Sequence, residues 1–187
     1  MSNVGKVCFV FAIIFTLVFC VSIGARKVKS IEFNHGCEEY LKRAADANTV
    51  EMAKEELSKA IDYAEENNLT EGIVSVIFKN PKNDIGYWYK NMKASYEELD
   101  KLPEDATSLE KTNVLMKLRE TLTDDSGDSG TSVTIPEGIS VYPNNVMYAI
   151  WGWVSFILAA AFWIAYYIKE VILWSLDSYL DRHRGRR

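Results

Sequence analysis

Four residues near the start of the middle part of the chain have side chains that could hold a metal or act in catalysis: His35, Cys37, Glu38 and Glu39. Imidazole, thiolate and carboxylate groups are the usual ligands of zinc. A single H-x-C sequence lacks the further ligands that a zinc site needs, and a solvated helix start explains the same residues. We therefore expect neither a metal nor a cofactor at this position.

The rest of the chain offers little catalytic chemistry. The only other histidine is His183, and the motifs HExxH, CxxC, GxSxG, GxGxxG and GxxxxGK[ST] are absent. Asp124, Asp125 and Asp128 could offer oxygen ligands, but the calcium-loop spacing and its distal Glu are missing. We expect a protein that is not an enzyme.

The segment 146–168 determines where we expect the protein to reside. It contains 23 residues without a formal charge, and a helix of that length would extend about 35 Å. A hydrocarbon core of about 30 Å needs about 20 such residues. Aromatic residues that favour the headgroup region lie mostly towards its ends: Trp151, Trp153, Trp163, Tyr166 and Tyr167. The alternative, a buried helix of a soluble core, rarely runs this long without a polar face.

A second uncharged segment, 7–25, follows Lys6. Its 19 residues suffice for a transmembrane anchor. A cleavable signal peptide is the alternative, although the basic start is a single lysine and Ile23-Gly24-Ala25 matches the small-residue cleavage site poorly. We favour a transmembrane anchor, or an uncleaved signal anchor, over 1–29.

Charge is distributed unevenly along the chain. The segment 30–145 contains 23 acidic and 12 basic residues, whereas the remaining ends contain 9 basic and 3 acidic residues. Basic ends around an acidic middle predict N- and C-termini in the cytoplasm of a plasma or inner membrane, although the basic residues at 26–29 argue against this orientation. The acidic middle excludes nucleic acid as a partner.

The tail 169–187 is amphipathic and basic. Residues 169–180 either extend the membrane helix or lie in the interface plane. Four arginines near the C-terminus would contact anionic lipid headgroups, although a plain topology signal explains them equally well: Arg182, Arg184, Arg186 and Arg187.

The acidic middle, 30–123, predicts a small helical bundle. Residues 37–67 are rich in helix formers and predict either one kinked helix or two stacked helices, with Asn48 and Glu51 resembling a capping box. Asp84 is the expected N-cap of a helix over 85–102. Thr107 and Glu110 predict a second capping box. The helix after it is expected to bury Leu109, Leu115, Leu118 and Leu122.

Three segments are less regular. The apolar stretch 73–78 predicts a short strand or a buried extension. The Gly-, Ser- and Asp-rich segment 123–132 predicts a flexible tether. Alternation over 133–142 predicts a hairpin or extended chain lying against the membrane or the bundle, so we assign 124–145 to a tether and extended segment.

Two groups of residues suggest contact surfaces. The aromatic set Tyr87, Trp88, Tyr89 and Tyr96 exceeds what one helix face would bury, so some of these rings could contact a partner protein. In the second apolar segment, small residues allow another helix to approach closely: Gly152, Ser155 and Ala159. That helix could be the chain's own first segment, another copy in a homo-oligomer, or another protein.

Together these patterns predict an all-α membrane protein in which two transmembrane helices flank a small extracytoplasmic helical bundle, with a short β segment as an option. The expected partners are the lipid bilayer and another membrane or extracytoplasmic protein, for which the chain would be an accessory or assembly subunit. The alternative is a membrane sensor in which a ligand bound by the bundle shifts the transmembrane helices; it requires an apolar pocket near Trp88 and Tyr96.

Overall fold

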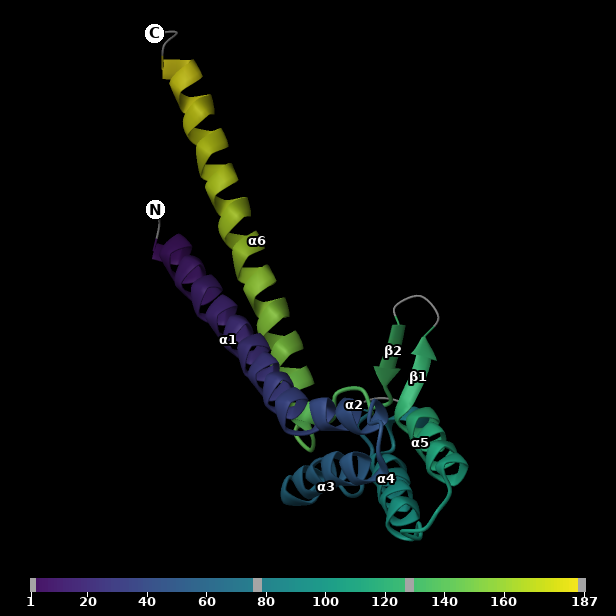
Figure 1. The fold of residues 1–187 in the computed structure, drawn as a ribbon. Helices are drawn as coiled ribbons and strands as arrows, with labels where there is room; N and C mark the ends of the chain where they lie inside the picture. The colour runs from purple at the N-terminus through teal and green to yellow at the C-terminus, as the bar shows by residue number, and fades with distance from the viewer. Residues whose placement is uncertain (1–2, 76–78, 127–129, 185–187) are drawn as a thin grey trace. The chain divides into compact units, whose positions relative to one another are not determined.

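The chain is mainly helical and divides into two compact units (Figure 1). The computed structural model describes residues 3–75, 79–126 and 130–184. Helices account for 79% of the structure, which confirms the mainly helical fold class. Unit 1 comprises Met1–Ala25 and Met147–Arg187, and unit 2 comprises Arg26–Val146.

Unit 1 is formed by two long apolar helices. These are α1 (Asn3–Phe33), whose last residues belong to unit 2, and α6 (Asn145–Arg184). Each helix is long and apolar enough to cross a membrane. A signal sequence or a long core helix can have the same length and composition. Only 6% of each apolar window is buried within the protein, whereas a soluble core helix is mostly buried. The helix continues without a break through 169–184, so the tail extends α6.

Aromatic rings hold the two helices in antiparallel register. Going from Phe9 to Phe11 to Phe19 along α1, the ring partners are Tyr166, Phe162 and Phe156 of α6, at centroid distances of 5.4, 5.3 and 5.4 Å. Because the partners run in the opposite order, the start of 7–25 lies beside the end of 146–168. The two uncharged segments are therefore aligned along their lengths.

Several polar side chains inside this helix pair have hydrogen-bond partners, although the buried Glu170 Oε1 has none among the described residues. The Trp163 indole N–H donates to the Thr16 hydroxyl at 3.2 Å, and the Thr16 hydroxyl donates to the Ala12 carbonyl at 2.7 Å. Ser155 donates to the Trp151 carbonyl. Such bonds allow polar groups to reside among apolar side chains without a large desolvation cost.

In unit 2 four helical segments pack around α3. A π-helical turn (Asn34–Glu38) leads into α2 (Glu39–Ala45), and α3 (Val50–Glu66) follows after a break at 46–49. The π-helical turn and α2 both contact α3. Two later helices, α4 (Ile85–Asp100) and α5 (Ser108–Leu122), also contact it. The core is formed along the apolar stripe of α3 by Ala53, Leu57, Ala60 and Ala64.

Residues 37–67, which we expected to form either one kinked helix or two stacked helices, contain the two separate helices α2 and α3. The N-cap of α3 is Thr49, whose side chain accepts a hydrogen bond from the Met52 N–H at 3.2 Å. The N-cap is therefore one residue later than Asn48, and the capping box predicted from Asn48 and Glu51 is wrong. Thr49 can cap because its extended backbone directs the hydroxyl towards the free N–H groups of the first turn.

The starts of α4 and α5 lie where the sequence predicted them. The Asp84 carboxylate accepts from the Tyr87 N–H at 3.0 Å, and Thr107 and Glu110 form the predicted capping box. Leu118 and Leu122 are buried, but Leu109 is 69% exposed. The prediction for Leu109 is wrong because this first-turn residue precedes the part of α5 that packs on the core.

Part of the segment predicted to be a flexible tether forms a β-hairpin. Strands β1 (Thr123–Ser126) and β2 (Gly130–Val133) pair antiparallel, with Thr123 opposite Val133. The hairpin predicted within 133–142 is absent; that segment contains a 3-10 turn at Ile139–Val141. Its buried residue Ile139 belongs to the core of unit 2. Earlier in the chain, Ile73 forms one isolated bridge with Asp84, and 76–78 lie outside the described residues.

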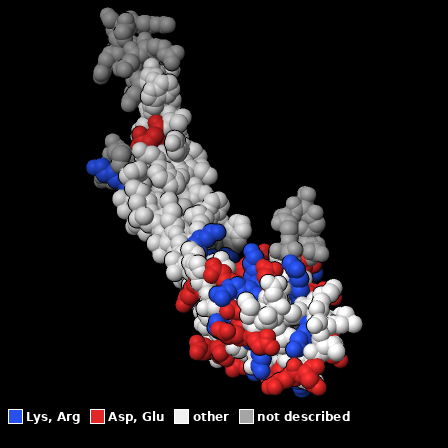
Figure 2. Space-filling model, viewed as in Figure 1, with Lys and Arg blue, Asp and Glu red and all other residues white. Residues whose placement is uncertain are grey.

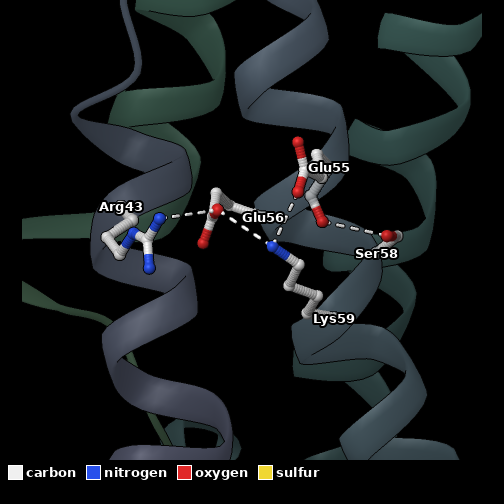
Figure 3. A network of polar contacts seen from close by, with 5 residues as sticks. All are labelled: Arg43, Glu55, Glu56, Ser58 and Lys59. Atoms are coloured by element: carbon white, nitrogen blue, oxygen red, sulfur yellow. Dashed lines mark hydrogen bonds and ion pairs between the residues drawn. The ribbon is translucent and has the colours of Figure 1, made fainter.

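One carboxylate is buried between α2 and α3. Glu56 is only 6% exposed, and its Oε1 accepts from Arg43 at 2.9 Å and from Lys59 at 3.2 Å (Figure 3). Its other oxygen, Oε2, has no hydrogen-bond partner among the described residues. Two cations on one oxygen offset the cost of burying this charge and fix α2 against α3.

Gly36, in the π-helical turn, permits a close approach to α3. A Cβ built at Gly36 would lie 2.2 Å from the Tyr63 ring, which packs edge-on against Phe33 at a centroid distance of 5.9 Å. Only a residue without a side chain fits this position without displacing that ring.

We therefore expect Gly36→Ala to lower the free energy of unfolding of unit 2 by about 1–3 kcal/mol, because the methyl group overpacks the contact. Urea unfolding of the detergent-solubilised chain would measure this. Gly24→Ala is the matched control, since its Cβ would meet nothing within 4 Å. A Gly36→Ala variant as stable as the parent would show instead that the Tyr63 ring moves away freely.

Candidate partner-binding site

The N-cap of α4 directs its first two aromatic residues to different surroundings. Because Asp84 fixes the first turn, Tyr87 and Trp88 follow each other at a helical step of about 100°. Tyr87 is 65% exposed, whereas Trp88 is 7% exposed and belongs to the core. Of these two rings only Trp88 therefore lies on the buried face of α4.

A pocket of about 660 Å³ lies beside these two residues. It is bounded by the start of α4, the end of α5, the hairpin and the segment 134–137 that follows it. Its apolar side chains include Trp88, Met92, Leu122 and Ile135. Pockets of this size with apolar walls and a few polar groups are typical ligand sites. The whole pocket is built from residues of unit 2.

The Trp88 side chain also has an unused donor. Its indole N–H is buried and has no hydrogen-bond partner among the described residues. A buried N–H without an acceptor costs about 1–3 kcal/mol.

Tyr89 and Tyr96 do not join this site. Tyr89 donates its hydroxyl proton to the Glu65 carboxylate on α3, and the Lys93 ammonium donates to the same oxygen at 2.8 Å. Tyr96 lies under the Lys54 ammonium, 5.7 Å from its ring centroid. The four aromatic residues predicted as one contact surface therefore divide between the pocket and the α3–α4 contact.

The polar contacts between α3 and α4 change the acidity of their members. Hydrogen bonds from Lys93 and Tyr89 lower the pKa of Glu65 below its ordinary 4.5. Desolvation and the bond to Glu65 raise the pKa of Tyr89. A smaller hollow of about 310 Å³ beside Tyr96 is lined mainly by polar and charged residues. These shifts follow from pairing between the two helices, and the hollow beside Tyr96 is not an apolar pocket.

The side chains that could have formed a metal or catalytic site are not brought together. His35 is exposed and its Nδ1 lies 2.9 Å from a Glu39 carboxylate oxygen. Cys37 is fully buried and its Sγ faces the Ala60 carbonyl at 3.8 Å. One side chain faces solvent and the other faces α3.

The small residues predicted to lie at a helix contact in the membrane have different positions within unit 1. Ser155 is 2% and Ala159 is 7% exposed, and Ala12 of α1 is also buried. A Cβ at Gly152 would meet nothing within 4 Å, so this glycine is outside the close contact. Arg182 and Arg184 lie in the last turns of α6, but their side chains are outside the described part of the structure, as are Arg186 and Arg187 entirely.

Sequence reasoning missed the far wall of the pocket. Val133, Ile135 and Pro136 line it together with α4, although they are more than forty residues from Trp88 in the chain. The alternation over 133–142 indicated only that this segment lies against the bundle or the membrane. Which helix it faces depends on the hairpin, where Thr134 N–H donates to the Leu122 carbonyl at 2.8 Å.

Comparison of the chain with models of protein families, with curated proteins and with solved structures finds no match. The function is therefore argued from the residues and the geometry of this chain.

The Glu65 contact predicts a pH-dependent stability. Because its folded-state pKa is lowered, Glu65 stabilises the folded state above its ordinary value of 4.5, and that stabilisation is lost as the pH falls through the lowered value. We expect Glu65→Gln to lower the urea midpoint at pH 7 but not below the folded-state pKa. Glu66→Gln, at an exposed neighbour, should not lower the urea midpoint at pH 7. A difference in urea midpoint between Glu65→Gln and the parent that persists at low pH would contradict the pairing.

Proposed function

We propose that this protein is a two-span membrane protein whose acidic helical unit binds another protein as an accessory or assembly subunit. The observation that carries the proposal is the apolar pocket beside Trp88, with exposed Tyr87 at its edge. Aromatic residues of this kind are enriched at protein–protein contacts. This surface would give a partner protein a place to bind.

The antiparallel register of unit 1 supports the membrane part of the proposal. The uncharged segments 7–25 and 146–168 lie side by side, so one apolar layer could cover both. Lys6 precedes the first uncharged segment and Lys169 follows the second, so both lysines lie at the same end of the antiparallel pair. On the face seen in Figure 2, charged residues of both signs cover unit 2 and are nearly absent from the helices of unit 1.

For orientation we propose that both termini are cytoplasmic, which places unit 2 on the extracytoplasmic side of a plasma or inner membrane. The excess of basic residues near the C-terminus and the acidity of 30–145 support this choice. The lipid bilayer is then a partner along both helices.

A photo-crosslinking experiment tests partner binding. With p-benzoylphenylalanine in place of Tyr87, we expect a crosslinked product with a different protein in intact cells, because this ring is exposed beside the pocket. The same replacement at Met116, 57% exposed on α5 and absent from the pocket lining, is the control. A product of twice the chain's mass would instead indicate a homo-oligomer. No product at Tyr87, or equal products at both positions, would contradict the proposal.

Labelling with a membrane-impermeant maleimide tests the orientation. The native Cys37 is unsuitable because it is fully buried. We therefore expect labelling of intact cells through an introduced Glu104→Cys in a chain with Cys8→Ser and Cys20→Ser, since Glu104 lies on the exposed connection between α4 and α5. The same chain with Glu104 retained is the control. Labelling only after lysis would place unit 2 in the cytoplasm.

The sensor function is the second candidate, and one observation favours it. The pocket lies between α4 and the segment 134–137, which leads through the chain into α6. A ligand held there would restrain this connection, and could thereby bias the membrane helices. The apolar pocket that this function requires is present near Trp88 but does not extend to Tyr96.

A further inference from the structure

We propose that the pocket beside Trp88 binds an extended peptide segment of the partner, in which a lysine or arginine neighbours an apolar side chain. This inference rests on the proposed function and adds the chemistry of the bound segment. It follows from two properties of the pocket: an apolar floor and a rim of carboxylates that have no ion pair within the described ranges.

The floor would receive the apolar side chain. Trp88, Met92 and Leu122 line the pocket and are 7, 1 and 4% exposed, so each presents only a small area to an incoming group. These side chains are held by the core of unit 2. A floor that is already packed loses little conformational freedom on binding, which favours affinity.

The rim would receive the basic side chain. Three acidic residues line the pocket, Asp84, Asp124 and Glu137, against one basic residue, Lys82. Asp84 is occupied as the N-cap of α4. Asp124 and Glu137 are exposed, and neither has an ion pair within the described ranges. A rim of this sign attracts cationic side chains and repels acidic segments.

An extended peptide satisfies the floor and the rim together. Successive side chains of an extended segment point to opposite sides, but a lysine or arginine side chain is long enough to reach back to the exposed rim from the position beside an apolar residue that enters the floor. A small amine offers at most one charge and one apolar group, whereas a peptide repeats both. The excess of acidic residues over 30–145 also disfavours nucleic acid.

The test uses the full chain in nanodiscs of phosphatidylcholine and fluorescence anisotropy of labelled octapeptides. The probes are an octapeptide of alternating leucine and arginine, one of leucine and glutamine, and one of leucine and glutamate. Isoamylamine is the small competitor, and empty nanodiscs correct for lipid binding. We expect the leucine–arginine peptide to bind about tenfold or more tightly than the leucine–glutamine peptide, and the glutamate peptide not to bind.

Two double variants with the same change in net charge identify the site. Asp124→Asn with Glu137→Gln should weaken the leucine–arginine peptide by about fivefold or more. Glu104→Gln with Asp105→Asn, at exposed residues outside the pocket lining, should change it by less than about twofold. Trp88→Phe should weaken all bound peptides, with thermal unfolding confirming that the variant is folded. The first double variant changes only exposed residues, so it tests the site even if Trp88→Phe does not fold.

Several results would overturn the inference. Equal weakening by the two double variants would mean that the peptide binds the diffuse negative charge of unit 2. If the glutamine or glutamate peptide binds as tightly as the arginine peptide, the carboxylates of the rim do not select a basic side chain. If isoamylamine displaces the labelled peptide at the same concentration as unlabelled peptide does, the pocket is a small-amine site. Failure of the peptides with a crosslinked partner still captured at Tyr87 would leave the proposed function standing. If the peptides do not bind and no partner is crosslinked at Tyr87, both this inference and the proposed function are wrong.

Discussion

The close packing of α3 against the helical segment before it is the contact on which the rest of unit 2 depends. Cys37 and Leu41 on one side meet Ala53, Leu57 and Ala60 on the other, and all are buried. Small side chains allow the two backbones to approach, so substitutions that add volume disturb more than their own contact. The buried Glu56 carboxylate ties the same two helices together through Arg43, and a charge in this position tolerates little displacement.

With α3 fixed, α4 has two distinct surfaces. One surface faces α3, where Tyr89 and Lys93 meet Glu65. The other contributes Tyr87 and Trp88 to the pocket. The same helix therefore supports the fold through one set of aromatic residues and offers a contact surface through another, and this division explains why the core can hold Trp88 rigidly at the floor of an open site.

Unit 1 follows a different principle. Its two helices are held by ring contacts, and its internal polar groups bond within the pair, as Trp163 does with Thr16. Helices in an apolar environment must satisfy their polar groups internally, because water is absent there. An aligned pair of uncharged segments in which Thr16, Ser155 and Trp163 have partners suits such an environment, and this is the physical basis for proposing that the pair anchors unit 2 to a membrane.

The sequence alone determined the features that depend on neighbours in the chain. Uncharged length predicted α1 and α6, and local hydrogen bonding predicted the starts of α4 and α5 at Asp84 and Thr107. Tertiary structure decided the features that depend on distant residues. Leu109 is exposed although it fits the helical period, the predicted tether forms a hairpin, and Trp88 meets Ile135 in one pocket. Periodicity and capping act over three or four residues, whereas these outcomes depend on which surfaces pack together once the helices have formed.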